Sequence, residues 1–431
     1  MPLWLDATDF EFAEAFGALV GARRESDADV SRDVAAIIAD VRARGDAAVA
    51  ELTLKFDRVD LDASGWRIGT AECAAAYAAL DKDLRSALDL AANRIADFHA
   101  KQRPSDSEST DSVGARLGSR WRAVDAAGIY VPGGRAAYPS SVLMNALPAK
   151  VAGVERLVMV TPTPDGHVNP LVLAAAHLAR VDEVWRIGGA QAVAALAFGT
   201  GQIAPVDVIT GPGNAWVAEA KRQLFGVVGI DMVAGPSEIV VVADAANDPQ
   251  IIAADLLSQA EHDPTSQSIL FTDDADFARV VWAAVDKTIP TLGTAAVAEA
   301  SWRDYGAIII VPTLADAIPL CDRLAPEHLQ LAVDSAQADA LFARVRHAGS
   351  VFIGRHTPEA IGDYVAGPNH VLPTGRRARF ASGLSVLDFM KRTSFLALDQ
   401  AALGAIGPAA VALATAEGLP AHALSVSQRL K

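Results

Sequence analysis

The chain has 431 residues, of which 51% are hydrophobic and 21% charged, so it can bury several cores and is too long for one domain of usual size. Its formal net charge of −15 excludes a general electrostatic attraction to nucleic acid or to an anionic membrane. Only two cysteines occur, and the N-terminus lacks a signal-peptide pattern, so we expect a cytoplasmic protein without a disulfide framework.

Helical patterns come first along the chain. Residues 31–55 have the pattern of a helix with a break at Gly45, and residues 81–100 predict a second helix. Residues 101–115 are rich in Ser and Asp and contain a proline, which predicts a loop or a domain boundary. We therefore expect residues 1–110 to form an N-terminal helical region that contributes to the first α/β domain.

Strand, glycine turn and helix then alternate. This order is typical of an α/β fold with a mainly parallel sheet and helices on both faces. It predicts one such domain at 111–236 and a second at 237–382. Residues 383–431 are rich in small residues, read as helical and are too short for an independent domain. We expect this C-terminal arm to pack against another part of the protein or a second subunit.

Three strand–glycine–helix junctions lie in the first α/β region, at "IYVPGG", "IGGAQA" and "ITGPGN". Such junctions place backbone N–H groups at the carboxyl edge of a sheet, where phosphate-bearing ligands are commonly held, so a nucleotide is a plausible ligand. Glycine also serves tight turns, and Trp216 stands where the third glycine of the dinucleotide fingerprint belongs. A purely structural role for each turn therefore stays open.

A polar pair ends the helical pattern at "LLSQAEHDP". Gln259 and His262 are three residues apart, so both project from one face of the helix and could share a metal ion. The alternative is an ordinary histidine at a helix end. In "APEHLQL", the neighbours Glu327 and His328 suit proton transfer, because burial and neighbouring charges can tune both groups toward neutral pH. A glutamate that stabilises a helix start is the alternative there.

Three further residues carry suitable chemistry. Asp363 lies in the loop-like "IGDYVAGPNH", and Glu417 and His422 flank the Gly-Leu-Pro break of "AEGLPAHAL". A turn aspartate and a charged helix end are the alternatives. Taken with the earlier pair, Gln, His, Asp and His form an oxygen-and-nitrogen set that suits zinc or manganese without any cysteine.

In their order along the chain, these motifs resemble those of the histidinol dehydrogenase family. The similarity covers nearly the whole sequence and includes "GIDMVAGPSEI" and "GPGNAWVAEAKR". It implies a zinc-dependent, NAD-linked enzyme that oxidises L-histidinol through the aldehyde to L-histidine, the last two steps of histidine biosynthesis. It also implies two incomplete Rossmann-like domains with mainly parallel sheets, with small helical N- and C-terminal extensions that intertwine in a homodimer with shared active sites.

The resemblance also implies roles for single residues of this sequence. The zinc ligands would be Gln259, His262, Asp363 and, from the partner subunit, His422. Proton transfer would fall to Glu327 and His328. The substrate would meet Ser237, Gln259, His262, His328, Asp363, Glu417 and His422. The NAD site would be lined by Tyr130, Gln191 and Asn214.

One position departs from the expected family pattern, and other functions remain as alternatives. Gln330 in "EHLQL" stands where we expect an acidic residue in many relatives, which affects local electrostatics. The alternatives are a dehydrogenase of another polar alcohol, a metal-dependent hydrolase in which Glu327 activates water, and a non-catalytic binding protein. The retained Glu417 and His422 argue against a changed alcohol, and three glycine junctions are unneeded in a hydrolase.

Overall fold

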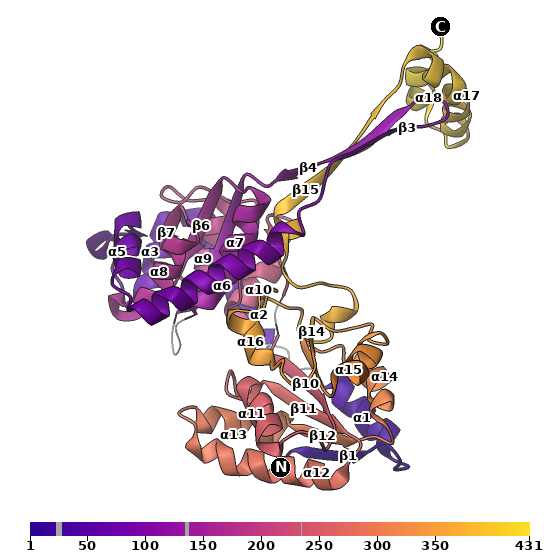
Figure 1. The fold of residues 1–431 in the computed structure, drawn as a ribbon. Coiled ribbons are helices and arrows are strands. Elements are labelled where there is room, and N and C mark those ends of the chain that lie inside the picture. The colour runs from indigo at the N-terminus through magenta and orange to yellow at the C-terminus, as the bar shows by residue number, and fades with distance from the viewer. Residues whose placement is uncertain (23–27, 134–137, 234) are drawn as a thin grey trace.

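The computed structural model describes residues 1–22, 28–133, 138–233 and 235–431. Two six-stranded sheets, each covered by helices, form the body of the molecule, and a long arm projects from it (Figure 1). This mixed α/β architecture with mostly parallel sheets confirms the predicted fold class.

The first sheet is parallel except for its short edge strand β2. Its strands lie in the order β2 (Arg67–Ile68), β7 (Glu183–Trp185), β6 (Arg156–Val160), β5 (Ala126–Tyr130), β8 (Val208–Thr210), β9 (Gly229–Ile230). Side chains of a strand alternate between two faces, so Ile129 enters one buried cluster and Tyr130 the other. Both faces are apolar, which is why these strands read as almost continuous hydrophobic runs.

Helices from two parts of the sequence cover the first sheet. One buried cluster contains side chains of α5 (Thr70–Ala78), α6 (Lys82–Ala100), α7 (Pro139–Ala152) and α8 (Pro170–Leu178). The opposite cluster contains side chains of α2 (Ala28–Arg44), α3 (Asp46–Asp57), α4 (Leu61–Ser64), α9 (Gly189–Phe198) and α10 (Ala215–Leu224). The predicted break at Gly45 is confirmed, since this residue separates α2 from α3 with a φ of 57°.

The second sheet is parallel throughout. Its order is β1 (Leu3–Asp6), β12 (Ala307–Ile310), β11 (Gln267–Thr272), β10 (Glu238–Ala243), β13 (His328–Ala332), β14 (Ser350–Ile353). One face is covered by α11 (Pro249–Ala260), α12 (Ala275–Thr288) and α13 (Ala295–Tyr305). The other is covered by α1 (Phe12–Gly21), α14 (Leu314–Leu324) and α15 (Ser335–Phe342). Because β1 pairs with β12, the first residues of the chain belong to the second sheet, while α2–α6 of the same N-terminal region cover the first sheet.

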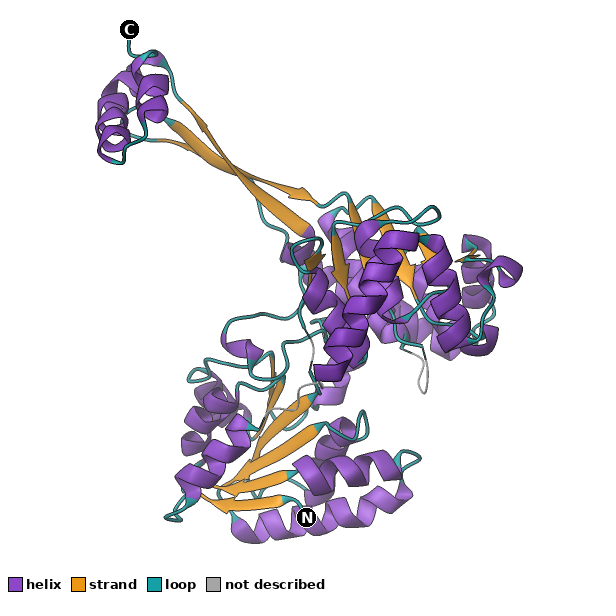
Figure 2. Ribbon diagram, turned by 180° about the vertical axis from the view of Figure 1, so that it is seen from behind, coloured by secondary structure: helices purple, strands orange, loops and turns teal. Residues whose placement is uncertain are grey.

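An antiparallel ribbon carries the arm. It consists of β3 (Ser107–Thr110), β4 (Arg116–Ala123) and β15 (Met390–Ala397), and it leads to α17 (Gln400–Ala416) and α18 (Pro420–Ser427) at the tip (Figure 2). The prediction of a loop or domain boundary at 101–115 therefore misses β3, and the prediction of a helical arm at 383–431 misses β15. Among the described residues, no helix is both long and apolar enough to cross a membrane.

Candidate active site

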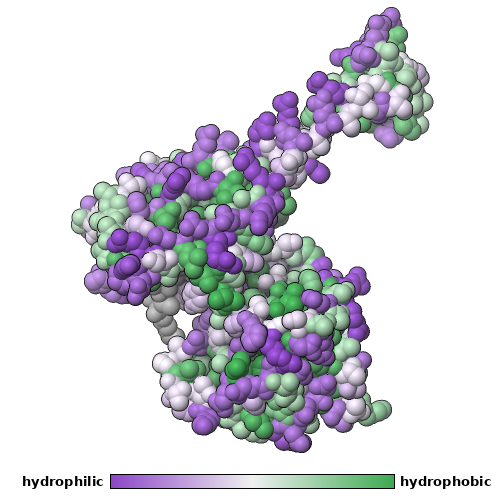
Figure 3. Space-filling model, viewed as in Figure 1, coloured by the Kyte–Doolittle hydropathy of each residue, from purple (hydrophilic) through white to green (hydrophobic). Residues whose placement is uncertain are grey.

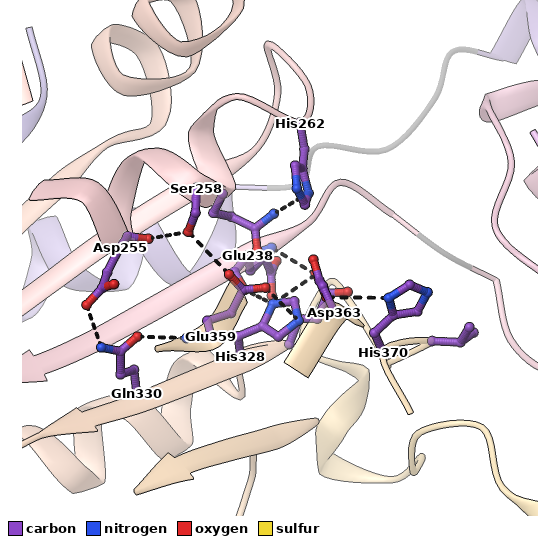
Figure 4. Close-up of polar contacts among 12 residues, drawn as sticks. Glu238, Asp255, Ser258, His262, His328, Gln330, Glu359, Asp363 and His370 are labelled. Atoms are coloured by element: carbon purple, nitrogen blue, oxygen red, sulfur yellow. Dashed lines mark hydrogen bonds and ion pairs between the residues drawn. The ribbon is translucent and has the colours of Figure 1, made fainter. Parts of the chain in front are cut away.

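Polar side chains gather at the amino ends of the central strands of the second sheet (Figure 4). Glu327 directly precedes β13, and His328 is its first residue. Glu238, the first residue of β10, contacts both through its backbone. Parallel pairing of β10 with β13 sets His328 opposite Ile239, so the sheet itself holds the acid and the imidazole together.

His328 is buried and held in one tautomer. Its Nδ1 lies 3.0 Å from the carbonyl oxygen of Glu238. A carbonyl oxygen only accepts hydrogen bonds, so Nδ1 carries the proton and Nε2 keeps a free lone pair. Burial lowers the pKa of His328 to about 4, against an attractive effect of the Asp363 carboxylate. The imidazole is therefore neutral near pH 7 and can accept a proton at Nε2.

Glu327 is buried beside it. Its Oε2 accepts a hydrogen bond of 3.0 Å from the Glu238 backbone N–H and lies 3.7 Å from His328 Nδ1. Burial raises the pKa of Glu327 well above its usual value, and the carboxylates of Glu238, Asp363 and Glu359 add to the shift. A carboxyl group tuned in this direction can exchange a proton at a pH where an exposed glutamate stays ionised.

Gln259 and His262 meet, as their spacing predicted. Gln259 lies in the last turn of α11 and is fully buried, while His262 follows the helix and is exposed. The Nε2 of Gln259 lies 3.2 Å from Nδ1 of His262. The amide oxygen Oε1 of Gln259 is buried and has no hydrogen-bond partner within the described chain. A buried acceptor without a donor costs free energy unless a ligand such as a cation satisfies it.

Asp363 lies near the end of a short helix, α16 (Glu359–Tyr364), and not in the expected loop. Its Oδ1 is 3.5 Å from Nδ1 of His370. Burial alone would raise the pKa of Asp363, but the hydrogen bond from His370 and the nearby imidazoles of His328 and His262 hold it below its usual value. Asp363 is thus kept as a carboxylate close to both predicted histidines of the site.

Glu359 is a site residue that the sequence analysis missed. Ligand atoms of His328, Glu359 and Asp363 lie within 4.8 Å of one another. Burial, with the Asp363 carboxylate, raises the pKa of Glu359 to about 8, and its Oε1 lies 3.7 Å from Nε2 of His328. Its position four residues before Asp363 on one helix face was a signal that could have found it.

The unusual Gln330 lies directly behind this cluster. Its Nε2 donates to Oδ2 of Asp255 at 2.6 Å, and its Oε1 accepts from the backbone N–H of Glu359 at 3.2 Å. A neutral amide satisfies both partners at once, whereas a carboxylate at this position would face Asp255 without a donor. Gln330 therefore links β13 to α16 and supports the position of Glu359.

Two substrate residues of the predicted set are not brought to this cluster within one chain. Glu417 and His422 are exposed at the tip of the arm, away from the second sheet (Figure 1). Ser237, in contrast, directly precedes β10, and its carbonyl oxygen accepts from Gln267 N at 3.0 Å. One chain therefore supplies all of the predicted site except its arm residues.

The predicted NAD residues lie at the carboxyl edge of the first sheet. The hydroxyl of Tyr130, at the end of β5, accepts from the Gly189 backbone N–H at 3.0 Å. Gln191 is buried in the first turn of α9. Asn214 caps α10, because its Oδ1 accepts from Trp216 N and Val217 N at 3.1 and 3.2 Å. The turn after β5 falls partly on residues 134–137, outside the described residues.

A buried ion pair fixes the turn that carries Asn214. Lys221 and Asp231 form a salt bridge with side chains only 3% and 1% exposed. Asp231 Oδ2 accepts from Gly211 N at 2.8 Å, and Lys221 Nζ donates to the Gly211 carbonyl at 2.9 Å. Gly211 has a φ of 114°, which only glycine adopts easily. Both backbone groups of this residue are thus clamped by opposite charges.

Comparisons with known proteins agree on one family. Residues 21–430 match the family model described as histidinol dehydrogenase. Curated histidinol dehydrogenases of Zymomonas mobilis and Rhodospirillum rubrum are 66% and 64% identical, covering 100% of this chain and 100% and 99% of the relatives. The crystal structure of histidinol dehydrogenase from Elizabethkingia anophelis matches with a TM-score of 0.93 and 34% identity, over 100% of this chain and 98% of that one.

Proposed function

Because the chain belongs to the histidinol dehydrogenase family, enzymes of histidine biosynthesis, we propose that it oxidises L-histidinol to L-histidine in two NAD-linked steps at a zinc site. The alcohol loses a hydride to become L-histidinaldehyde. Water then adds to the aldehyde, and a second hydride leaves to give the carboxylate. Two hydrides thus pass to two molecules of NAD⁺, and one water supplies the new carboxylate oxygen.

The single observation that carries this proposal is the buried pair at the start of β13. His328, neutral and with a free Nε2, takes the alcohol proton during the first oxidation. Glu327, whose pKa is raised by burial, takes a proton from the water that adds to the aldehyde. Burial thus keeps His328 in the neutral form that can accept a proton, and it raises the pKa of Glu327 above that of an exposed carboxylate.

The residues beside this pair fit zinc. The unpartnered Oε1 of Gln259, the imidazole of His262 and the carboxylate of Asp363 are oxygen and nitrogen donors of the kind zinc binds in proteins. Zinc would orient the substrate by its amine and imidazole and polarise the reacting oxygen. His422 of the partner subunit would complete the set.

The edge of the first sheet fits a dinucleotide. Thr163 and Thr210 follow or end strands at this edge, and both hydroxyls are buried without a hydrogen-bond partner in the described parts of the chain. Tyr130 and Gln191 lie at the same edge, beside the start of α9. NAD⁺ would accept the hydrides, and these polar groups would bind and orient it.

The arm supports a homodimer with shared active sites. Its helices expose large apolar side chains, namely Ile406 (41%), Leu413 (65%), Leu419 (41%) and Leu424 (56%). Hydrophobic residues gather at this tip (Figure 3), and apolar area of this kind is commonly buried by a partner. Glu417 and His422 lie among them, so docking on a second chain would bring both to its site. The unpaired, buried Cys73 and Cys321 fit a reducing cytoplasm.

Mixing two inactive variants tests the whole proposal. His262→Ala and His422→Ala should each abolish NADH production from histidinol. If the ligands come from both chains, mixed dimers regain one intact site and part of the activity. No activity after mixing would refute the shared site, and no turnover of histidinol by the zinc-loaded wild type would refute the proposed reaction.

A further inference from the structure

An unpartnered carboxylate lies next to the proposed NAD site. Asp57 is the last residue of α3 and is only 8% exposed. Its Oδ2 is buried and makes no hydrogen bond within the described ranges. Thr53, one helical turn earlier, is fully buried, and its hydroxyl is likewise without a partner there. Residues four apart share a helix face, so α3 presents two unsatisfied polar groups on one side.

This face lies against the carboxyl edge of the first sheet. Burial raises the pKa of Tyr130 to about 12, and the nearby charge of Asp57 contributes to this shift, while the hydrogen bond from Gly189 opposes it. The next residue, Arg58, binds Asp165 on the loop after β6 through two contacts of 2.6 and 2.5 Å. This pair fixes the end of α3 beside Tyr130, the last residue of β5.

Without a bound ligand, the buried Asp57 carboxylate destabilises the folded protein. Burial raises the pKa of Asp57, which means that the charged form is disfavoured by its surroundings. Arg58 gives only a Coulombic offset, because its guanidinium is engaged by Asp165. Buried polar groups are normally hydrogen-bonded, so a ligand with hydroxyl donors would remove this cost.

We propose that Asp57 binds the hydroxyl pair of the adenosine ribose of NAD and excludes a cofactor with a 2′-phosphate. This inference rests on the proposed NAD-linked function and deepens it. A carboxylate accepts from both ribose hydroxyls, as acidic residues do in dinucleotide sites of α/β proteins. A 2′-phosphate would instead place two or more negative charges beside a buried carboxylate whose cationic neighbour in the described chain, Arg58, is already paired with Asp165. Asp57 is thus the residue that sets cofactor specificity.

The test compares Asp57→Asn with Glu51→Gln in the zinc-loaded enzyme. Both changes replace an acid on α3 by its amide, but the Glu51 side chain is 67% exposed and pairs with Arg44. Asp57→Asn should raise KM for NAD by about 10- to 100-fold, as expected for lost charge-assisted hydrogen bonds. KM for histidinol should stay within about twofold, and the preference for NAD over NADP should fall by about tenfold or more. Glu51→Gln should resemble the wild type in all three measurements.

Thermal unfolding without cofactor separates this role from a structural one. Removing an unpaired buried charge should leave the melting temperature of Asp57→Asn unchanged or higher, whereas loss of a structural contact would lower it. An unchanged KM for NAD with an unchanged cofactor preference overturns the inference, as does a wild type that uses NADP as well as NAD. If the wild type turns over no histidinol, calorimetric titration of NAD into the wild type and Asp57→Asn decides: equal affinities, or no binding, overturn it too.

Discussion

The buried pair of Lys221 and Asp231 gives a prediction whose size follows from the structure. Lys221→Met removes the cation and leaves the Asp231 carboxylate, 1% exposed, with the backbone N–H groups of Gly211 and Met232 as its remaining partners among the described residues. Breaking a buried ion pair in this way typically costs about 3–5 kcal/mol. The double variant Lys221→Met/Asp231→Leu leaves no uncompensated charge but three unsatisfied backbone groups, the N–H groups of Gly211 and Met232 and the carbonyl of Gly211, each worth about 1–3 kcal/mol. The double variant should therefore lose no more stability than the summed losses of the two single variants.

Urea denaturation followed by tryptophan fluorescence measures these differences. The control is Arg222→Met on the same helix: the Arg222 side chain is 56% exposed, and its buried partner Glu219 keeps the hydrogen bond from Gln223 at 2.8 Å, so this change should cost less than Lys221→Met. Because the pair clamps Gly211 and the turn that carries Asn214, Lys221→Met should also raise KM for NAD more than it lowers kcat. A loss of stability no larger than that of the Arg222 control would refute the reasoning.

Three other outcomes are expected. Glu327→Gln should lower the rate of histidinaldehyde oxidation by about 10²–10⁴-fold and leave the first hydride transfer intact. The NADH formed in a single turnover should then approach half the wild-type yield. An equal loss of rate in both oxidations would contradict separate roles for Glu327 and His328. Chelation of zinc should lower the melting temperature of the wild type, because an ion that binds the folded state stabilises it. The decrease should be smaller for Gln259→Ala. Equal decreases in both proteins would contradict a role of Gln259 in binding zinc. Burial lowers the pKa of His99 from 6.5 to about 4, so the unfolded chain takes up a proton at a higher pH than the folded chain does. Up to about 3 kcal/mol of folding stability should therefore be lost as the pH falls from 6.5 to 4. His99→Gln should flatten this pH dependence in denaturation curves, and a profile parallel to that of the wild type would refute the reasoning.

The sheets were predictable from the sequence because their signal is local. Buried parallel strands are short apolar runs that end in glycine turns, and the helix breaks at Gly45 and after Ala260 follow from residue type and spacing. The arm was not predictable in this way. Its strands β4 and β15 are exposed, largely polar and paired with residues more than two hundred positions away, so neither shows an apolar alternation.

The candidate active site likewise combines contacts that are predictable from local spacing with contacts that are not. The contact between Gln259 and His262 follows from a spacing of three across the end of α11. That Glu238 holds both Glu327 and His328 through its backbone depends on which strands pair, and this information is absent from any single segment. Gln330 could be noticed as unusual, but its bridge from Asp255 to Glu359 needed the tertiary structure.

The proposed dinucleotide site lies at the carboxyl edge of the first sheet, and the proposed zinc site lies at the amino edge of the second. The helix ends at each edge have the charge that suits the proposed ligand. Helices α9 and α10 begin at the carboxyl edge of the first sheet, so their positive ends face the proposed dinucleotide. Helices α11 and α14 end at the amino edge of the second sheet, next to Gln259 and Glu327, and each helix end carries about half a negative charge. Together they supply about one negative charge before any side chain is counted. If zinc and the ammonium group of histidinol bind here as proposed, part of their attraction would come from the backbone and would persist in any variant that replaces only a ligand side chain.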